Sequence, residues 1–172
     1  MDKFDVVVVG GGHAGVEAAY AVYRSGLSCA LVTFEKSKIG QMSCNPAMGG
    51  IAKGQIVREI DAIGGYSGIV TDKSSIQFKM LNLSKGPAMW SPRAQNDRAL
   101  FAQYWREMLE STPNLDFYQE MVKNLWIEKN KLCGVVTGLG QKIKGKTVVL
   151  TNGTFLNGLI HVGDKNFGGG RA

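Results

Sequence analysis

The stretch DVVVVGGGHAGVEAAYAVYRSGLSCALVTFE, residues 5–35, specifies the architecture of this chain. Asp5–Val9 is apolar and β-branched after its first residue, which predicts a buried parallel strand. Val16–Ser25 is rich in alanine and is followed by Gly26, a pattern typical of a helix that ends at that glycine. Leu27–Phe34 predicts a second strand. These three elements make one complete βαβ unit.

A glycine motif joins the first strand to the helix. Gly10 permits a tight turn, Gly12 lets the backbone approach a pyrophosphate, and Gly15 lets the helix pack on the strand. Glu35 ends the second strand, where a carboxylate can accept hydrogen bonds from ribose hydroxyls. A glycine-rich turn with a solvated glutamate is the alternative, and the complete βαβ context favours a dinucleotide site. The predicted site residues here are Gly10, Gly11, Gly12, His13, Ala14, Gly15 and Glu35.

His13 opens the predicted phosphate-binding helix. Its side chain either contacts phosphate or is simply exposed in the turn, and the second interpretation is the commoner one for such a residue.

The rest of the chain predicts a less regular order of elements. Residues 36–54 are glycine-rich and irregular, and the isoleucines at 56, 60 and 63 indicate a helix that ends at Gly64. Ile76–Asn82 alternates apolar and polar residues, as a strand with one solvated face does. Ser91-Pro92 predicts a helix start, which places Arg93 in the first helical turn and the helix end near Ser111. Further strands are predicted at residues 115–118, 122–128, 132–138 and 147–151.

This order resembles the glutathione-reductase-like FAD-binding domain, an α/β fold of the Rossmann type. A parallel sheet with helices is joined there by a small three-stranded β-meander, whereas an NAD-binding Rossmann domain continues with regular βα units. The resemblance implies that the main chain at Val122 contacts the adenine. It also implies that Thr151 and Gly153, in a second glycine motif, lie near the flavin or the pyrophosphate.

Composition limits the other classes of function. The net charge of +6 suits an anionic partner or a mildly basic solvated surface, and we expect the charges to be scattered. Three separated cysteines and two isolated histidines predict neither a disulfide framework nor a metal site. No apolar run is long enough for a membrane span and no signal peptide is evident, so a cytoplasmic location is expected.

Several longer motifs identify a family. The most distinctive is GQMSCNPAMGGIAKG at residues 40–54. Together with the first glycine motif, SKGPA at 84–88, RAQ at 93–95 and LTNGTFL at 150–156, it is similar to the MnmG (GidA) family of tRNA-modifying flavoenzymes. The resemblance covers essentially the whole chain.

The resemblance implies an activity and a set of partners. Members bind FAD, take hydride from NADH and use methylenetetrahydrofolate. With the GTPase MnmE they add an aminomethyl or carboxymethylaminomethyl group to C5 of the tRNA wobble uridine, and they form homodimers. Residues 1–172 would be the first, incomplete segment of the FAD-binding domain. An NADH-binding insertion and a C-terminal helical domain would lie beyond residue 172, so this segment alone is expected to be inactive.

Four further residues are candidates for the flavin end of the site. Cys44 lies in a glycine-rich loop before Asn45-Pro46, a possible helix start whose N-terminus, with Lys53, would favour a thiolate. A thiolate can add to C6 of uracil and thereby activate C5, although Cys44 could instead be structural or pack on the flavin. Lys85, Arg93 and Gln95 are predicted to contact the cofactor, Lys85 on the strength of the resemblance alone. A solvated arginine is the alternative for Arg93.

Three other classes of function compete with this one. A flavin disulfide reductase would need closely paired redox cysteines, which this sequence lacks. A folate-dependent tRNA methyltransferase is closer, but the segments around His13 and Cys44 favour the MnmG family. A non-catalytic nucleotide-binding fragment is the remaining alternative.

Overall fold

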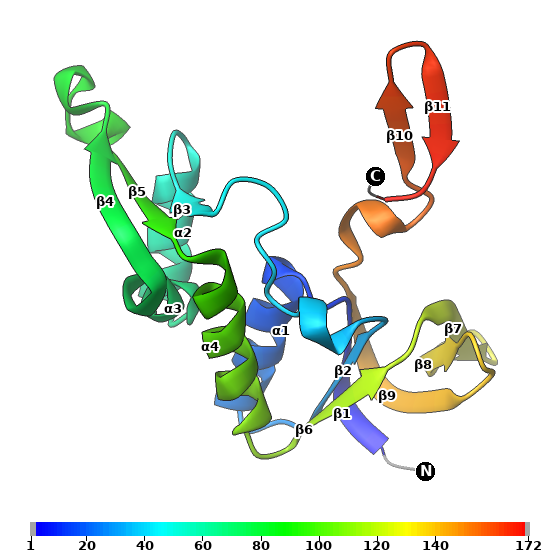
Figure 1. Cartoon of the computed structure of the whole chain (residues 1–172). Coiled ribbons are helices and arrows are strands. Elements are labelled where there is room, and N and C mark those ends of the chain that lie inside the picture. The colour runs from blue at the N-terminus through cyan, green and yellow to red at the C-terminus, as the bar shows by residue number, and fades with distance from the viewer. Residues whose placement is uncertain (1–2, 171–172) are drawn as a thin grey trace.

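The computed structural model describes residues 3–170, which form a main sheet with its helices, a second smaller region, and a protruding hairpin (Figure 1). The strands are β1 (Lys3–Val9), β2 (Cys29–Thr33), β3 (Ala47–Gly49), β4 (Ser75–Leu81), β5 (Ser91–Asn96), β6 (Leu115–Gln119), β7 (Val122–Glu128), β8 (Lys131–Thr137), β9 (Lys142–Leu150), β10 (Leu159–Val162) and β11 (Lys165–Gly168). The α-helices are α1 (His13–Arg24), α2 (Lys53–Ala62), α3 (Ser67–Ser74) and α4 (Arg98–Glu110). Short 3-10 helices are η1 (Lys36–Lys38), η2 (Leu83–Lys85), η3 (Pro87–Met89) and η4 (Gly153–Phe155).

The main sheet has six strands in the order β6-β2-β1-β9-β8-β7. The pairs β6–β2, β2–β1 and β1–β9 are parallel, while β9–β8 and β8–β7 are antiparallel. The βαβ unit of residues 5–35 therefore forms as predicted, with Val6 opposite Cys29. The predicted α/β class with a parallel sheet and a β-meander is confirmed.

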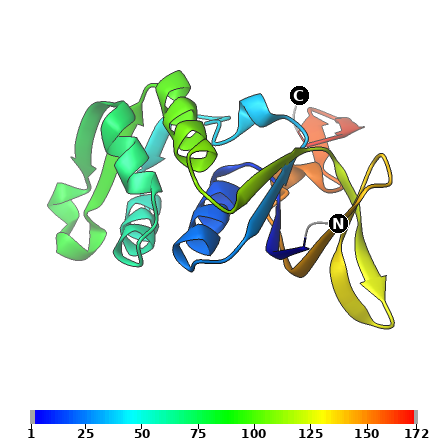
Figure 2. The same ribbon diagram turned by 90° about the horizontal axis from the view of Figure 1, so that it is seen from below.

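Two apolar layers bury the main sheet. On one face, α1 and α4 cover β1 and β2, and the side chains of Phe101 and Trp105 are fully buried there. On the other face, Val135 of β8 and Ile143 of β9 pack against Phe4 and Val7 of β1. The meander β7-β8-β9 thus closes the side of the sheet that the helices leave open (Figure 2).

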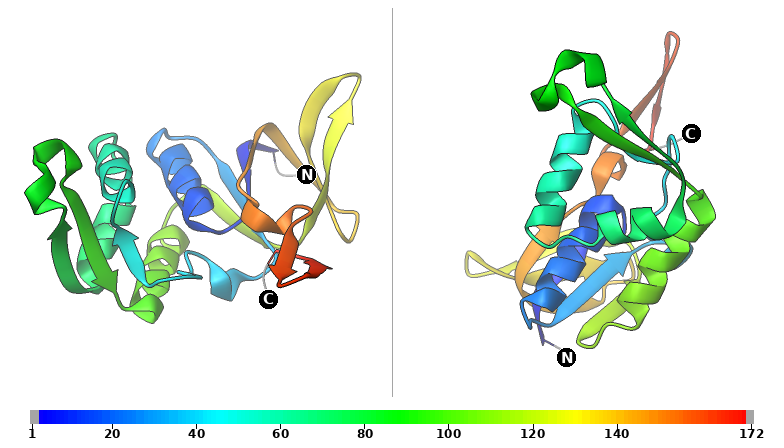
Figure 3. Two further views of the ribbon diagram at one scale, coloured as in Figure 1. Left: turned by 90° about the horizontal axis from the view of Figure 1, so that it is seen from above. Right: turned by 90° about the vertical axis from the view of Figure 1, so that its left-hand side faces the viewer.

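The second region holds the antiparallel sheet β3-β5-β4 with α2 and α3 (Figure 3). It is joined to the main sheet by polar and aromatic contacts. The Glu17 carboxylate on α1 accepts hydrogen bonds from the backbone N–H groups of Tyr66 and Ser67, at the start of α3. The Tyr66 ring stands edge-on to Trp105 of α4, with centroids 5.5 Å apart.

The predicted helix start at Ser91-Pro92 is wrong. Residues 91–96 form β5, which pairs with β3 on one side and β4 on the other. The helix begins instead at Arg98, because the Asp97 carboxylate accepts hydrogen bonds from the N–H groups of Ala99 (2.8 Å) and Leu100 (2.9 Å). Arg93 therefore lies in a strand, not in the first turn of a helix.

Three other expectations change in the folded chain. The order of strands favours a meander of residues 115–118, 122–128 and 132–138, but residues 115–119 form β6 at the parallel edge of the main sheet. The meander consists of β7, β8 and β9. The helix at residues 53–62 is confirmed, but Ile56 and the nearby Ile63 are exposed. The glycine-rich end of the chain forms the antiparallel hairpin β10–β11.

Candidate functional site

The turn between β1 and α1 is shaped by three glycines with different surroundings. Gly10 has φ +108°, and a Cβ there would press on the carbonyl of Thr151. A Cβ at Gly15 would overlap the carbonyl oxygen of Gly10, so helix and strand touch at this point. A Cβ at Gly12 would meet no atom within 4 Å among residues 3–170. Gly10 and Gly15 are therefore required by packing, whereas Gly12 borders open space.

The N-terminus of α1 opens onto the same space. Gly12 occupies the N-cap position, and within the described residues no side chain caps this end and no acidic residue stands in the first turn. The first N–H groups of a helix have no intrahelical partner, and they carry the positive end of the helix dipole. This arrangement suits an anionic group such as a pyrophosphate.

Thr151 directly follows β9 and holds the glycine turn in place through hydrogen bonds to its backbone. Its hydroxyl donates hydrogen bonds to the carbonyl oxygens of Val9 (2.8 Å) and Gly10 (3.1 Å). Gly153 lies in η4 with φ +58°, and a Cβ there would meet no described atom. The structure thus brings both residues of the second glycine motif to the carboxyl ends of β1 and β9.

Glu35 lies at the carboxyl end of β2, beside the turn. One carboxylate oxygen accepts hydrogen bonds from the hydroxyl (2.7 Å) and the backbone N–H (3.3 Å) of Ser37. These bonds lower the pKa of Glu35, so the side chain is ionised at neutral pH. An ionised carboxylate at this edge retains acceptor capacity for ribose hydroxyls.

Val122 is brought to the same edge of the sheet. The N–H of Glu120 donates a hydrogen bond to the carbonyl oxygen of Thr33 at the end of β2 (2.9 Å). The N–H of Gly138 donates a hydrogen bond to the carbonyl oxygen of Met121 (2.7 Å). Val122, the first residue of β7, therefore lies beside the carboxyl ends of β2 and β6, on the side where Glu35 leaves the sheet.

His13 is part of the turn but does not act as a fixed positive charge. Its ring lies 5.6 Å from the ring of Phe101. The residue as a whole is exposed, but partial desolvation of the imidazole is the larger effect and lowers the pKa of His13, against an opposing hydrogen bond with the Gly40 backbone. His13 is thus mostly neutral near pH 7. Ala14 beside it is exposed.

Cys44 lies exposed in the loop that leads from η1 to β3. The Arg98 guanidinium donates a hydrogen bond to the Cys44 carbonyl oxygen (2.7 Å), and the N–H of Asn96 donates to Pro46 (2.7 Å). The predicted helix start at Asn45-Pro46 is wrong, because these residues enter β3, which pairs with β5. No helix N-terminus begins there to stabilise a thiolate.

Two of the three remaining candidates lie near that loop. Arg93 and Gln95 are neighbours on β5, and the guanidinium of Arg93 donates a hydrogen bond to the Gln95 amide oxygen (3.0 Å). Gln95 pairs with Ala47, three residues after Cys44. Lys85 lies in η2, at the opposite end of the β4–β5 ribbon, so the structure does not bring it to this group.

Arg98 is a member of this group that was not predicted from the sequence. The signal was present in the Asp97-Arg98 pair, whose aspartate caps α4 and so directs the arginine toward the Cys44 loop.

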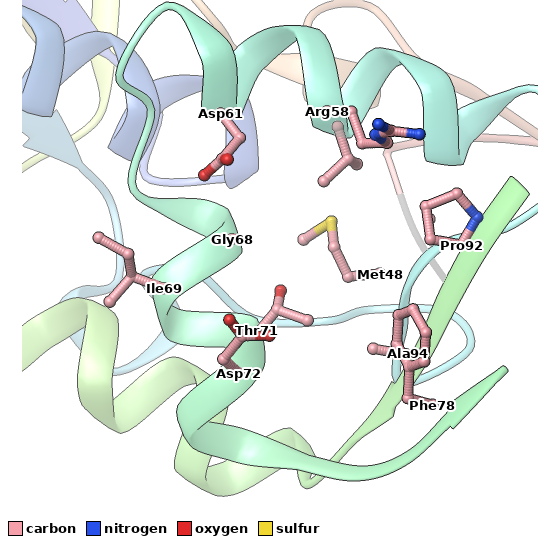
Figure 4. Close-up of a pocket in the computed structure, with 12 residues that line it drawn as sticks. Met48, Arg58, Asp61, Gly68, Ile69, Thr71, Asp72, Phe78, Pro92 and Ala94 are labelled. Carbon is pink, nitrogen blue, oxygen red and sulfur yellow. The ribbon is translucent and has the colours of Figure 1, made fainter. Parts of the chain in front are cut away.

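A separate hollow lies in the second region, between α2, α3 and β5 (Figure 4). Met48, Arg58, Asp61, Thr71, Asp72 and Phe78 line part of it. It contains none of the residues predicted for the dinucleotide site. Residues 3–170 also contain no cluster of three or more His, Cys, Asp or Glu side chains that could hold a metal ion. No helix in the described part of the chain is long and apolar enough to cross a membrane.

Comparison with known proteins shows which sequences and structures this chain is similar to. The chain is 70% identical, over all 172 residues, to the tRNA uridine 5-carboxymethylaminomethyl modification enzyme MnmG of Flavobacterium psychrophilum, of which it spans 28%. The structure of Aquifex aeolicus GidA is 54% identical, with a TM-score of 0.92 over 99% of this chain and 28% of that one. The GidA-related protein from Thermus thermophilus shares the fold, with a TM-score of 0.64 at 20% identity over 98% of this chain and 61% of that one.

The family model described as Glucose inhibited division protein A matches residues 5–172, which is nearly the whole chain. This chain therefore belongs to the glucose-inhibited division protein A family.

Proposed function

We propose that this chain is the FAD-binding segment of a tRNA-modifying flavoenzyme. The observation that carries the proposal is the open space beside Gly12, bordered by the uncapped N-terminus of α1. Glu35 and Val122 stand at the same edge of the sheet, which is the arrangement that a dinucleotide lying across parallel strands requires. The relative's name as a tRNA uridine modification enzyme supports the substrate.

Each part of FAD has a candidate partner in this chain. The N–H groups at Gly11–Gly15 would hold the pyrophosphate, the Glu35 carboxylate the adenosine ribose, and the Val122 main chain the adenine. Thr151 and Gly153 would border the flavin side of the pyrophosphate, with Arg93 and Gln95 farther along and Lys85 as a more distant candidate. Bound FAD would supply the hydride chemistry, which the protein residues orient.

The test is Gly12→Val in a full-length protein that carries this chain. A Cβ at this position meets no described atom, and the valine side chain would occupy the space for the phosphates, so flavin should be lost while the fold is retained. Flavin absorbance of the purified protein measures its FAD content, and thermal unfolding checks that the fold is retained. Gly168→Val is the matched control, because its Cβ also meets no described atom and it lies in β11. Normal FAD content in Gly12→Val would overturn the proposal.

The activity of the whole protein follows from the family resemblance. We propose that it uses NADH and methylenetetrahydrofolate, works with the GTPase MnmE, and adds a (carboxymethyl)aminomethyl group to C5 of the tRNA wobble uridine. A homodimer in the cytoplasm is the proposed setting. The identity of 70% to a tRNA uridine modification enzyme supports this assignment over another class of flavoprotein.

Cys44 is the proposed nucleophile in this segment. Its thiolate would form a bond to C6 of uracil, moving electrons into an enolate across C5 and C4. C5 would then attack a one-carbon electrophile, after which loss of the C5 proton expels the thiolate. Exposure of Cys44 supports access to such a substrate, and the Arg98 hydrogen bond supports a defined loop position.

A conservative replacement tests this role. Cys44→Ser in the full-length protein should bind FAD and oxidise NADH normally, yet leave wobble uridine unmodified, because loss of a single nucleophile costs many orders of magnitude in rate. Nucleoside analysis of tRNA by mass spectrometry gives the readout. Wild-type levels of modified uridine in this variant would remove Cys44 from the mechanism.

A further inference from the structure

The positive charge of this chain is concentrated in the meander. Residues 122–146 contain six lysines and one glutamate, so they carry +5 of the net charge of +6. The expectation of scattered charge is wrong for this segment. Six exposed side chains make up what we call the lysine surface: Lys123, Lys129, Lys131, Lys142, Lys144 and Lys146.

Strand geometry places three of these lysines on one face. Along β9, Ile143 is buried and a Cβ at Gly145 would press on Val7 of β1. Both positions therefore face the apolar core between β1 and the meander. Lys142, Lys144 and Lys146 alternate with these two residues, so their side chains point away from that core. Residues two apart along a strand are spaced by roughly 6.5–7 Å. That spacing is of the same order as the distance between successive phosphates of an RNA strand.

Only part of this charge is neutralised within the chain. Lys146 is paired with Asp5 (2.6 Å), and Lys142 lies 3.8 Å from Glu128 and over the Trp126 ring. Lys129, Lys131 and Lys144 have no ion pair within residues 3–170. Lys144 also stands opposite Lys3 of β1, which extends the positive surface onto the neighbouring strand.

We propose that the lysine surface binds the phosphate backbone of tRNA. The inference rests on the proposed function, which makes tRNA the substrate, and adds the surface that holds it. Charge complementarity favours this partner, because phosphate contacts by lysine supply the sequence-independent part of nucleic-acid affinity. The meander lies at the opposite end of the molecule from β4 and β5 (Figure 1).

The test measures binding of a full-length protein that carries this chain to a labelled, unmodified tRNA transcript by fluorescence anisotropy over a series of salt concentrations. The first variant combines Lys129→Gln, Lys131→Gln and Lys144→Gln, which break no ion pair among the described residues. The matched control combines Lys73→Gln, Lys79→Gln and Lys165→Gln, which are exposed, lie outside the meander and remove the same charge. Loss of three phosphate contacts should reduce the salt slope of log Kd by roughly two to three, whereas the control should leave it nearly unchanged.

The outcomes separate the proposal from its alternatives. An equal reduction of the salt slope in both triple variants would show that net charge alone attracts tRNA. An unchanged salt slope in the first variant would also overturn the proposal. Displacement by polyglutamate as effective as by unlabelled tRNA would point to an acidic protein partner instead. Circular dichroism checks that each variant is folded. The single variants Lys129→Gln and Lys131→Gln, in the β7–β8 hairpin, should each reduce the salt slope of log Kd by about 0.7–0.9. The Gly12→Val test of FAD binding uses other residues and another readout. A failure of the proposed function can therefore be distinguished from a failure of the proposed tRNA-binding surface.

Discussion

At the scale of single residues, two of the three cysteines of this chain have opposite surroundings. Cys29 is completely buried in β2, and burial raises its pKa to about 12, whereas Cys44 is exposed. At pH 8 the thiolate fraction of Cys29 should be roughly three orders of magnitude below that of an ordinary cysteine with a pKa near 8.5. Iodoacetamide should therefore modify Cys44 first and leave Cys29 unmodified until the chain unfolds, as peptide mass spectrometry would show. Equal rates at both cysteines in the folded chain would contradict the burial of Cys29.

At the scale of elements, one carboxylate joins the two regions. Glu17 on α1 accepts hydrogen bonds from the N–H groups at the start of α3, the shortest being 2.7 Å from Ser67. Glu17→Ala should lower the free energy of unfolding by about 1–3 kcal/mol, because it leaves these N–H groups unpaired beside the Tyr66 and Trp105 rings. Urea unfolding gives the measurement. Glu59→Ala on α2 is the control, since the Glu59 side chain is exposed and has no hydrogen bond or ion pair in the described part, and an effect as large there would refute the capping role.

At the scale of the whole molecule, residues 1–172 contain a single GxGxxG motif, which we assign to FAD. Hydride transfer needs the nicotinamide stacked on the flavin, so a second binding surface is required. We expect this chain alone to bind FAD weakly, to oxidise no NADH and to modify no tRNA. Nicotinamide absorbance of the purified chain with added FAD and NADH checks this, with free FAD as the baseline. Turnover comparable to that of a full-length relative would show that this chain holds a complete active site.

The fold around the proposed dinucleotide site could be predicted from the amino-acid sequence, because the signals there are local. The apolar run of β1, the glycine turn and the alanine-rich helix are each specified by adjacent residues. The position of Glu35 follows, since a strand of fixed direction delivers its last residues to a known edge of a parallel sheet. The distinctive loop at residues 40–54 likewise indicates the family from its residues alone.

Features that depend on distant pairing emerge only in the folded chain. Ser91-Pro92 has the local pattern of a helix start, yet strands on both sides hold residues 91–96 in a sheet. The same pairing turns Asn45-Pro46 into a strand entry and places Arg98 beside Cys44. Lys142, Lys144 and Lys146 share one face of β9 because Ile143 and Gly145, which alternate with them, pack against β1. Local sequence sets the preference of a segment, but long-range contacts between strands override it when they satisfy the hydrogen bonds on both edges.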